Sequence, residues 1–225
     1  MRELVRIQAV FFDIGETLID ETRQWGMWAD WLGVTRLTFF AALGALIERG
    51  EHHRRVFEIV RPGIDLARER AARAAAGLDE RIEPGDFYLD ALPCLRELRA
   101  RGYRIGLAGN QPIAAEAQLR SLGLPADIVA SSAGWGVEKP APEFFARIAA
   151  AACVPASSIA YVGDRLDNDV LPAAAAGMVA VFVRRGPWGH LHATQPAAEL
   201  AAIRLDTLAE LPAALAQYDA ERASS

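Results

Sequence analysis

The stretch "AVFFDIGETLID", residues 9–20, is an apolar run that ends on an acid. Asp13 closes the run, and Gly15 and Glu16 follow it closely. A strand that is apolar throughout is typical of a parallel sheet covered by helices on both faces. Ligands of such sheets bind beyond the carboxyl ends of the strands. Asp13 therefore stands where chemistry is expected.

Similar apolar runs recur along the chain and alternate with helical patterns, which indicates repeated strand–helix–strand units. The expected strands are 5–12, 103–108, 127–131, 159–163 and 179–183. The expected helices are 91–101, 112–121, 142–152, 168–176 and 207–217, with a frayed polar tail after the last. The sequence predicts an α/β fold, with a Rossmann-like three-layer core around a mainly parallel sheet.

Residues 20–88 break this rhythm, because they show helical patterns and no strand pattern. Three tryptophans at three-residue steps lie on or near one helical face: Trp25, Trp28 and Trp31. We interpret them as core residues of this segment, with a wall of a substrate site as the alternative. The predicted organisation is a core formed by 1–19 and 89–225, and an inserted all-helical subdomain formed by 20–88.

Composition narrows the range of functions. The apolar fraction of 52% is ample for a packed core, and the formal charge of −5 argues against a surface for nucleic acid or anionic membranes. No apolar run reaches the roughly 18 residues that a membrane span needs, and the N-terminus leads straight into the first expected strand. Cys94 and Cys153 lie far apart without a C-x-x-C pattern, so we expect buried free thiols in a reducing cytoplasm. A cytoplasmic protein without nucleic-acid or membrane partners is the resulting expectation.

Residues that are candidates for a functional site follow four successive expected strands or stand in the loops after them. They are Asp13, Gly109 with Asn110, Lys139, and Asp164 with Asp169. Lys139 is the only lysine among 24 basic residues. Each feature alone is common in turns, but the ordered set indicates one site at the carboxyl edge of the sheet.

This set resembles the haloacid dehalogenase superfamily, most of whose members are Mg²⁺-dependent phosphohydrolases. The resemblance covers nearly the whole chain and is carried by "FFDIGETL", "GLAGN", "EKPAPEFF" and "YVGDRLDNDV". Segment 20–88 is similar to the helical cap of that superfamily. The resemblance implies a hydrolase, leaning towards a phosphatase that acts on a small phosphorylated metabolite or an acyl phosphate.

The resemblance also implies roles for the individual residues. Asp13 would attack phosphorus and form an aspartyl-phosphate. Mg²⁺ would screen the repulsion between the carboxylate and the phosphate. The implied metal ligands are Asp13, the backbone carbonyl of Gly15, Asp164 and Asp169. Lys139 would neutralise the phosphoryl oxygens, and Gly109 with Asn110 would cradle the transferring group.

Two positions depart from the family pattern. Most phosphatases of the superfamily carry an aspartate where this chain has Gly15, and that acid is worth about 10²–10⁴-fold in rate. Glu16 could reach over as a substitute, with a turn residue as the alternative. Gly109 stands where the family usually has Ser or Thr, so one side-chain donor is lost. We expect slow turnover, unless the substrate has a good leaving group.

Three other functions are weighed against this interpretation. A non-catalytic or regulatory binding protein on the same fold is favoured by the two departures. A 2-haloacid dehalogenase would also lack the second aspartate, but those enzymes need no Mg²⁺, and the retained Asp164 and Asp169 argue for a cation. Phosphonate cleavage would need a lysine in the cap, and 20–88 contains none.

The histidines are interpreted as exposed helix and loop residues, with metal ligation as the alternative. They are His52, His53, His190 and His192. The last two belong to "RRGPWGHLH", which follows the fifth expected strand and could line the rim of the site.

Overall fold

The structure is a computed structural model that describes residues 6–224. Its described residues form two compact units. The core unit contains the chain up to Asp20 and from Glu83 onward, and the insert unit is Glu21–Ile82.

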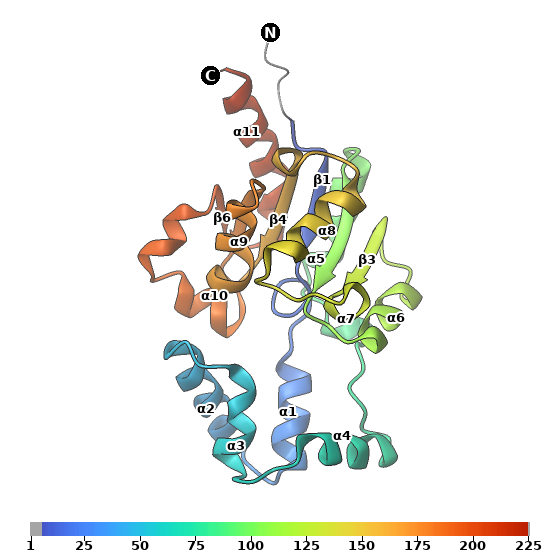
Figure 1. Cartoon of the computed structure of the whole chain (residues 1–225), viewed down its shortest axis with the longest axis vertical. Helices are drawn as coiled ribbons and strands as arrows, with labels where there is room; N and C mark the ends of the chain where they lie inside the picture. The colour runs from blue at the N-terminus through green and yellow to red at the C-terminus, as the bar shows by residue number, and fades with distance from the viewer. Residues whose placement is uncertain (1–5, 225) are drawn as a thin grey trace. The chain divides into compact units, whose positions relative to one another are not determined.

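The core unit is built on six parallel strands in the order β3-β2-β1-β4-β5-β6 (Figure 1). The strands are β1 (Ala9–Phe12), β2 (Arg104–Gly109), β3 (Ile128–Ser131), β4 (Ile159–Gly163), β5 (Val179–Val183) and β6 (Ile203–Leu205). Every residue of β1, β4 and β5 is buried, as expected for strands covered on both faces. The strand order reverses between β1 and β4, and crevices for ligands form beyond the strand ends at such a reversal.

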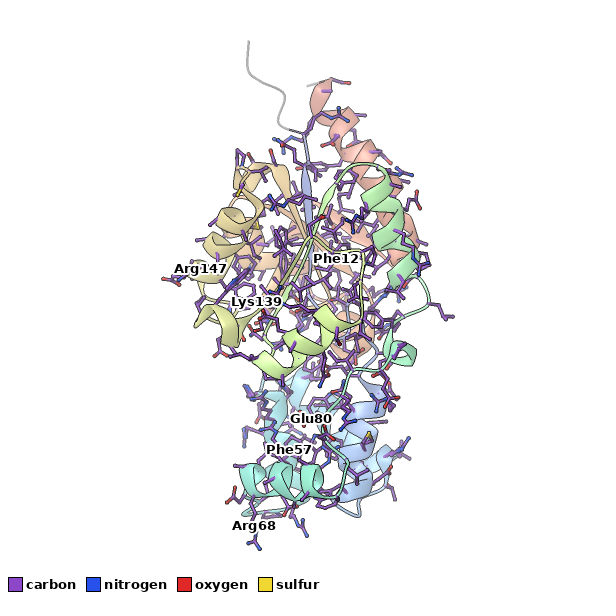
Figure 2. The ribbon with its side chains drawn as sticks, turned by 90° about the vertical axis from the view of Figure 1, so that its right-hand side faces the viewer. Phe12, Phe57, Arg68, Glu80, Lys139 and Arg147 are labelled. Carbon is purple, nitrogen blue, oxygen red and sulfur yellow. The ribbon has the colours of Figure 1, made fainter. Side chains whose placement is uncertain are left out.

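Helices cover both faces of this sheet, which confirms the predicted α/β architecture. In Figure 2, α8, which carries Arg147, lies on one side of the sheet, and α5 and α11 lie on the other. The α-helices are α5 (Ala91–Ala100), α6 (Ile113–Ser121), α7 (Ser132–Trp135), α8 (Pro142–Ala152), α9 (Leu171–Ala175), α10 (Gly186–His192) and α11 (Leu211–Ala223). Shorter turns are the 3-10 helices Pro84–Asp86, Ala156–Ser158, Pro196–Leu200 and Leu208–Glu210, and a π-helix at Leu166–Val170. The buried rings of Phe145 and Tyr161 pack edge to face at 5.3 Å between these layers.

Most predicted elements are confirmed, and the exceptions have local causes. β4 and β5 have the predicted bounds, and residue 5 of the first expected strand lies outside the described residues. The short edge strand β6 was not predicted, because only three residues alternate around the exposed Arg204. The prediction of a frayed tail is wrong as far as Ala223, because "DAERA" continues α11. Its Asp219 Oδ1 accepts the N–H of Ile7 at 3.1 Å, which ties this helix to the start of the sheet.

The two cysteines differ in their surroundings. Cys94 is buried in α5, as predicted. The same prediction is wrong for Cys153, which is exposed. It stands at the C-cap of α8 with φ +54°, where the chain turns at the surface.

The insert unit is helical and packs around aromatic rings. Its helices are α1 (Thr22–Trp31), α2 (Arg36–Glu48), α3 (Val56–Val60) and α4 (Leu66–Ala75), with a 3-10 turn at His53–Arg55. Trp28 is buried and meets Phe57 edge to face at 4.8 Å, so the core interpretation holds for this tryptophan. Each of the three indoles donates to a glutamate of the same unit: Trp25 to Glu21, Trp28 to Glu80 and Trp31 to Glu69. Among the described helices none alone is long and apolar enough to cross a membrane, and only α1 with α2, bent by 116°, reaches that length and composition together.

The two segments that lead out of the core unit pair with each other. The N–H of Asp20 donates to the carbonyl of Asp86 at 2.8 Å, and the N–H of Tyr88 donates to the carbonyl of Leu18 at 3.0 Å. An antiparallel bridge joins Ile19 to Phe87 between these bonds. The two segments are therefore hydrogen-bonded to each other in antiparallel fashion at the point where the insert begins and ends.

Candidate active site

Lys139 lies between two aspartates at the carboxyl edge of the sheet. Its Nζ donates to Asp13 Oδ1 at 2.7 Å and to Asp169 Oδ1 at 2.5 Å. Asp13 directly follows β1, and Asp169 lies in the π-helix after β4. The side chains of Lys139 and Asp169 are fully buried. Three residues singled out in the sequence therefore meet in one hydrogen-bonded ion triad.

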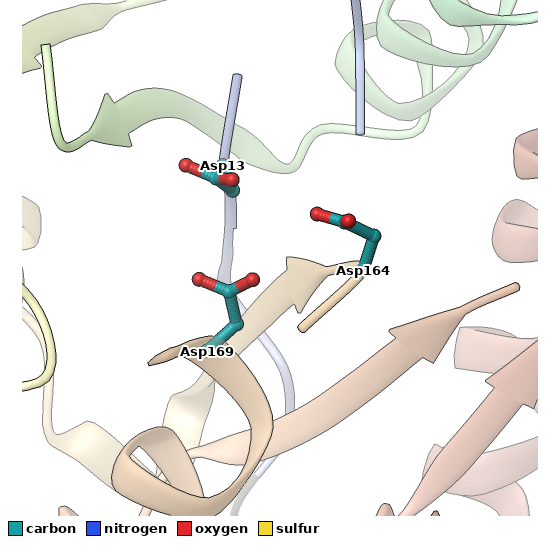
Figure 3. A group of neighbouring side chains, drawn as sticks. All are labelled: Asp13, Asp164 and Asp169. Atoms are coloured by element: carbon teal, nitrogen blue, oxygen red, sulfur yellow. The ribbon is translucent and has the colours of Figure 1, made fainter. Parts of the chain in front are cut away.

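Asp164 completes a cluster of three carboxyl groups, which Figure 3 shows side by side. One oxygen each of Asp13, Asp164 and Asp169 lies within 4.8 Å of the others. Asp164 Oδ1 accepts the hydroxyl of Thr17 at 3.2 Å, whereas its Oδ2 is buried and has no hydrogen-bond partner. Buried carboxylate oxygens are almost always satisfied, so an orphaned oxygen that belongs to an acidic cluster fits a cation ligand.

The charges of this cluster do not balance. Three ionised carboxylates around one ammonium leave two negative charges uncompensated in a buried site. Burial, with the charges of Asp169 and Asp13, raises the pKa of Asp164 well above its usual value. Burial, partly opposed by Lys139, raises the pKa of Asp169 to about 6. Burial by itself would lower the pKa of Lys139, but the charges of Asp13 and Asp169 raise it well above the usual value. A divalent cation would supply the charge that the cluster lacks.

Asn110 holds Lys139 in place. Its Oδ1 accepts the backbone N–H of Lys139 at 2.8 Å, and its Nδ2 donates to the backbone carbonyl of Lys139 at 2.9 Å. This pair of bonds fixes the loop after α7 against the end of β2. The side chain that the resemblance assigned to phosphate binding is thus engaged, on both its oxygen and its nitrogen, with the lysine backbone.

Gly109 leaves room for the Asp13 carboxylate. A Cβ on Gly109 would lie 2.5 Å from Asp13 Oδ1, the oxygen that Lys139 contacts. Any side chain here would have to displace that carboxylate. The loss of the Ser or Thr usual in the family therefore accompanies a close approach of the β2 backbone to the Asp13 side chain.

Glu16, the substitute acid considered in the sequence, is buried, and its carboxylate is hydrogen-bonded to Tyr88. It has a left-handed backbone with φ +54°, a conformation that costs a non-glycine residue roughly 1–2 kcal/mol. Its Oε2 accepts the hydroxyl of Tyr88 at 2.6 Å. A Cβ on Gly186, which itself has φ +61°, would lie 2.5 Å from the same oxygen. Burial and the charge of Glu16 raise the pKa of Tyr88, so this hydroxyl stays a donor.

Sequence reasoning missed several residues that support the Asp13 loop. Arg185, after β5, donates to the carbonyl of Thr17 at 3.1 Å and to both oxygens of Asp90 at 3.0 and 2.5 Å. Its guanidinium also lies 4.4 Å from the centre of the Tyr88 ring. Arg185 follows a strand at the carboxyl edge, so the rule that found Asp13 could have found it. Tyr88 and Asp90 carry no comparable signal.

The exposed interpretation is wrong for one histidine. His192 in α10 is buried, and its Nδ1 accepts the backbone N–H of Leu166 at 3.0 Å. His52 and His190 are exposed, as predicted, and His53 is half-buried. The segment "RRGPWGHLH" therefore contacts the loop that carries Asp164 and Asp169.

Comparisons with known proteins bear on the family and on the fold. The family model of haloacid dehalogenase-like hydrolases matches residues 7–177. A glyceraldehyde 3-phosphate phosphatase of Methanopyrus kandleri is 34% identical over 147 residues, and the match spans 63% of this chain and 63% of that protein. A haloacid dehalogenase superfamily hydrolase of Geobacter sulfurreducens has a TM-score of 0.66 at 21% identity, covering 93% of this chain and 96% of that one. A 2-haloacid dehalogenase of Pseudomonas syringae has a TM-score of 0.58 at 22% identity, covering 94% and 99%. Both structural likenesses concern the fold alone. From the family match, the chain belongs to the haloacid dehalogenase-like hydrolases.

Proposed function

We propose that the chain is an Mg²⁺-dependent phosphatase of small phosphorylated metabolites, with Asp13 as its nucleophile. The observation that carries this proposal is the buried cluster of three carboxylates around one lysine, with an orphaned oxygen on Asp164. Its uncompensated charge and all-oxygen donor set suit a hard divalent cation, which prefers carboxylate, carbonyl and water oxygens. The proposed ligands are Asp13, Asp164, Asp169 and the carbonyl of Gly15.

When bound, the cation would supply charge stabilisation for the transferring phosphoryl group. Asp13 would attack phosphorus while the bond to the leaving oxygen breaks, which gives an aspartyl-phosphate that water then hydrolyses. Lys139 donates to Asp13 and orients its carboxylate, and Asn110 holds Lys139. The backbone N–H groups after β2 are the proposed donors to the phosphoryl oxygens.

Proton transfer to the leaving group separates substrate classes. Gly15 has no acidic side chain, and Glu16 is the carboxyl next to it in the sequence, where it accepts the hydroxyl of Tyr88. An acyl phosphate releases a carboxylate, which can leave without a proton. An alkyl phosphate releases an alcohol oxygen, which needs a proton as it leaves. We propose that Glu16 serves alkyl phosphates, of which glyceraldehyde 3-phosphate is the first to test because a relative carries that name.

We also propose that the insert unit, Glu21–Ile82, selects the substrate in the manner of a cap. Ligand specificity is commonly carried by elements added to a conserved scaffold rather than by the scaffold itself.

The test is turnover of acetyl phosphate and glyceraldehyde 3-phosphate with and without Mg²⁺. We expect Mg²⁺-dependent release of phosphate from both, and none from Asp13→Asn. Glu16→Gln should lower glyceraldehyde 3-phosphate turnover by about 10²-fold or more and leave acetyl phosphate turnover within a few-fold. Binding of Mg²⁺ without turnover of either compound would refute the phosphatase and favour the non-catalytic binding protein.

A further inference from the structure

Helix α10 contacts the loop Asp164–Val170 at two points, although neither contact involves a proposed metal ligand. The first contact is the hydrogen bond from the N–H of Leu166 to His192 Nδ1, at 3.0 Å and fully buried. In the second, the guanidinium of Arg165 lies 5.1 Å from the centre of the Trp188 ring. Both contacting side chains of α10 are buried.

We propose that His192 and Trp188 are positioning residues that set the affinity of the site for its divalent cation. This inference rests on the proposed function, because the cation is the one assigned there. It assigns a role to "GPWGHLH", a segment that the phosphatase chemistry itself does not use.

The hydrogen bond to His192 is placed so that it can affect the positions of two proposed metal ligands, Asp164 and Asp169. Leu166 lies two residues after Asp164 and three before Asp169, so its backbone anchors the loop between them. Leu166 also begins the π-helix, whose first N–H groups lack partners within the helix. His192 supplies a partner from an element 26 residues further along the chain. Loss of this partner would remove one anchor of the loop between the two carboxylates.

The Trp188 contact acts on Asp169 through Arg165. The backbone N–H of Arg165 donates to Asp169 Oδ2 at 3.1 Å, and its carbonyl accepts the N–H of Asp169 at 3.0 Å. The side chain of Arg165 is fixed between the Trp188 ring and Asp167, whose oxygens it contacts at 3.1 and 2.6 Å. Holding this side chain holds the backbone that orients Asp169.

The chemistry of the bond restricts what can replace His192. A nitrogen that accepts a hydrogen bond carries no proton, so Nδ1 is the unprotonated nitrogen of this ring. Asparagine can place a carbonyl oxygen near the position of Nδ1, whereas leucine of similar volume has no acceptor. The pair His192→Asn and His192→Leu therefore separates the hydrogen bond from simple packing. His190→Leu is the matched control, since His190 is exposed on the same helix.

The experiment is titration calorimetry of the whole chain with MgCl₂. We expect the Kd for Mg²⁺ to rise about tenfold in His192→Leu, to stay within about threefold of wild type in His192→Asn, and to be unchanged in His190→Leu. Turnover of acetyl phosphate by His192→Leu should recover at saturating Mg²⁺, because the change affects binding of the metal and not the chemical step. An unchanged Kd in a folded His192→Leu would overturn the proposal.

Hydrogen exchange of the Leu166 amide gives a readout that needs no metal. Protection of this amide should be lost in His192→Leu and restored in His192→Asn; equal protection in all three proteins would also overturn the proposal. If the wild type shows this protection but binds no Mg²⁺, the proposed function fails and the contact between α10 and the loop stands. Should His192→Leu not fold, Trp188→Leu is the second variant, with an expected loss of Mg²⁺ affinity of about threefold; an unchanged affinity there would count against the proposal.

Discussion

Replacing Asp164 by asparagine should stabilise the metal-free protein. Asp164 carries the orphaned Oδ2 and lies within 4.8 Å of two other carboxylates. At an effective dielectric constant of about 20, each such neighbour repels an ionised Asp164 by about 3.5 kcal/mol. The protein can escape this repulsion by protonating Asp164, which at pH 7 costs about 4 kcal/mol for a carboxyl of ordinary pKa. After the cost of burying the new amide, we expect the free energy of unfolding to rise by about 2–3 kcal/mol.

The gain should depend on pH in a defined direction. The pKa values of Asp164 and Asp169 are raised in the folded protein, the latter to about 6. Between the unfolded pKa near 4 and these folded values, the folded state binds more protons than the unfolded chain. Stability of the wild type therefore falls as pH rises through this window. Below about pH 4 the carboxyls are protonated in both states, so the advantage of Asp164→Asn should vanish there.

Thermal unfolding in the presence of a chelator measures the effect. For a chain of this size we expect the Tm of Asp164→Asn to exceed that of wild type by about 5–10 °C at pH 7. Asp167→Asn is the matched control on the same loop, where an exposed ion pair with Arg165 is lost and stability should fall by at most about 1 kcal/mol. Mg²⁺ at about 100 times its Kd should add about 2.7 kcal/mol to wild type and much less to Asp164→Asn. An Asp164→Asn protein that unfolds at or below the wild-type Tm at pH 7 would refute the charge argument.

Three further substitutions probe the surroundings of the cluster. Lys139→Met removes the positive charge that contacts Asp13 and Asp169, so we expect loss of turnover and a fall of about 3–5 kcal/mol in the free energy of unfolding in urea; retained turnover would contradict its assigned role. Gly109→Ala should lower stability by about 1–3 kcal/mol and reduce turnover, because its Cβ meets a carboxylate at 2.5 Å. Gly44→Ala, in the open middle of α2, should instead raise stability by about 0.5–1 kcal/mol, and equal effects of the two glycine changes would show that close approach is irrelevant. Tyr88→Phe should cost about 1–3 kcal/mol of unfolding free energy through the lost donor to Glu16, and a neutral result in calorimetry would show that this bond is not needed.

The grouping of the four charged residues was predicted from where the expected strands end and from the family resemblance. Asp13, Lys139, Asp164 and Asp169 stand just after strands or in the loops that follow them, and parallel strands bring those points to one edge. What each side chain contacts did not follow. Asn110 binds the Lys139 backbone, a choice of partner that its position does not reveal.

The missed contacts come from segments that are distant in sequence or weak in pattern. Tyr88 reaches Glu16 across 72 residues, and nothing in the local sequence marks it. α10 begins "GPWG", a sequence of poor helix formers, so it was not predicted as a helix and His192 was not expected inside the protein. Burial of a histidine in such a segment depends on tertiary packing that local propensity does not contain.

The paired segments that lead out of the core have a consequence for how this protein can be altered. The backbone N–H of Asp20 donates to the carbonyl of Asp86 at 2.8 Å, and both residues belong to the core unit. The core therefore already holds together the two ends of the segment inserted between them. The entropy of closing a loop grows slowly, at about 0.6 kcal/mol per doubling of its length. The core should therefore accept a short turn or a different helical module at this junction with little change in its own stability. With the insert unit as the proposed selector of substrate, exchange of this module would change the substrate without a redesign of the sheet.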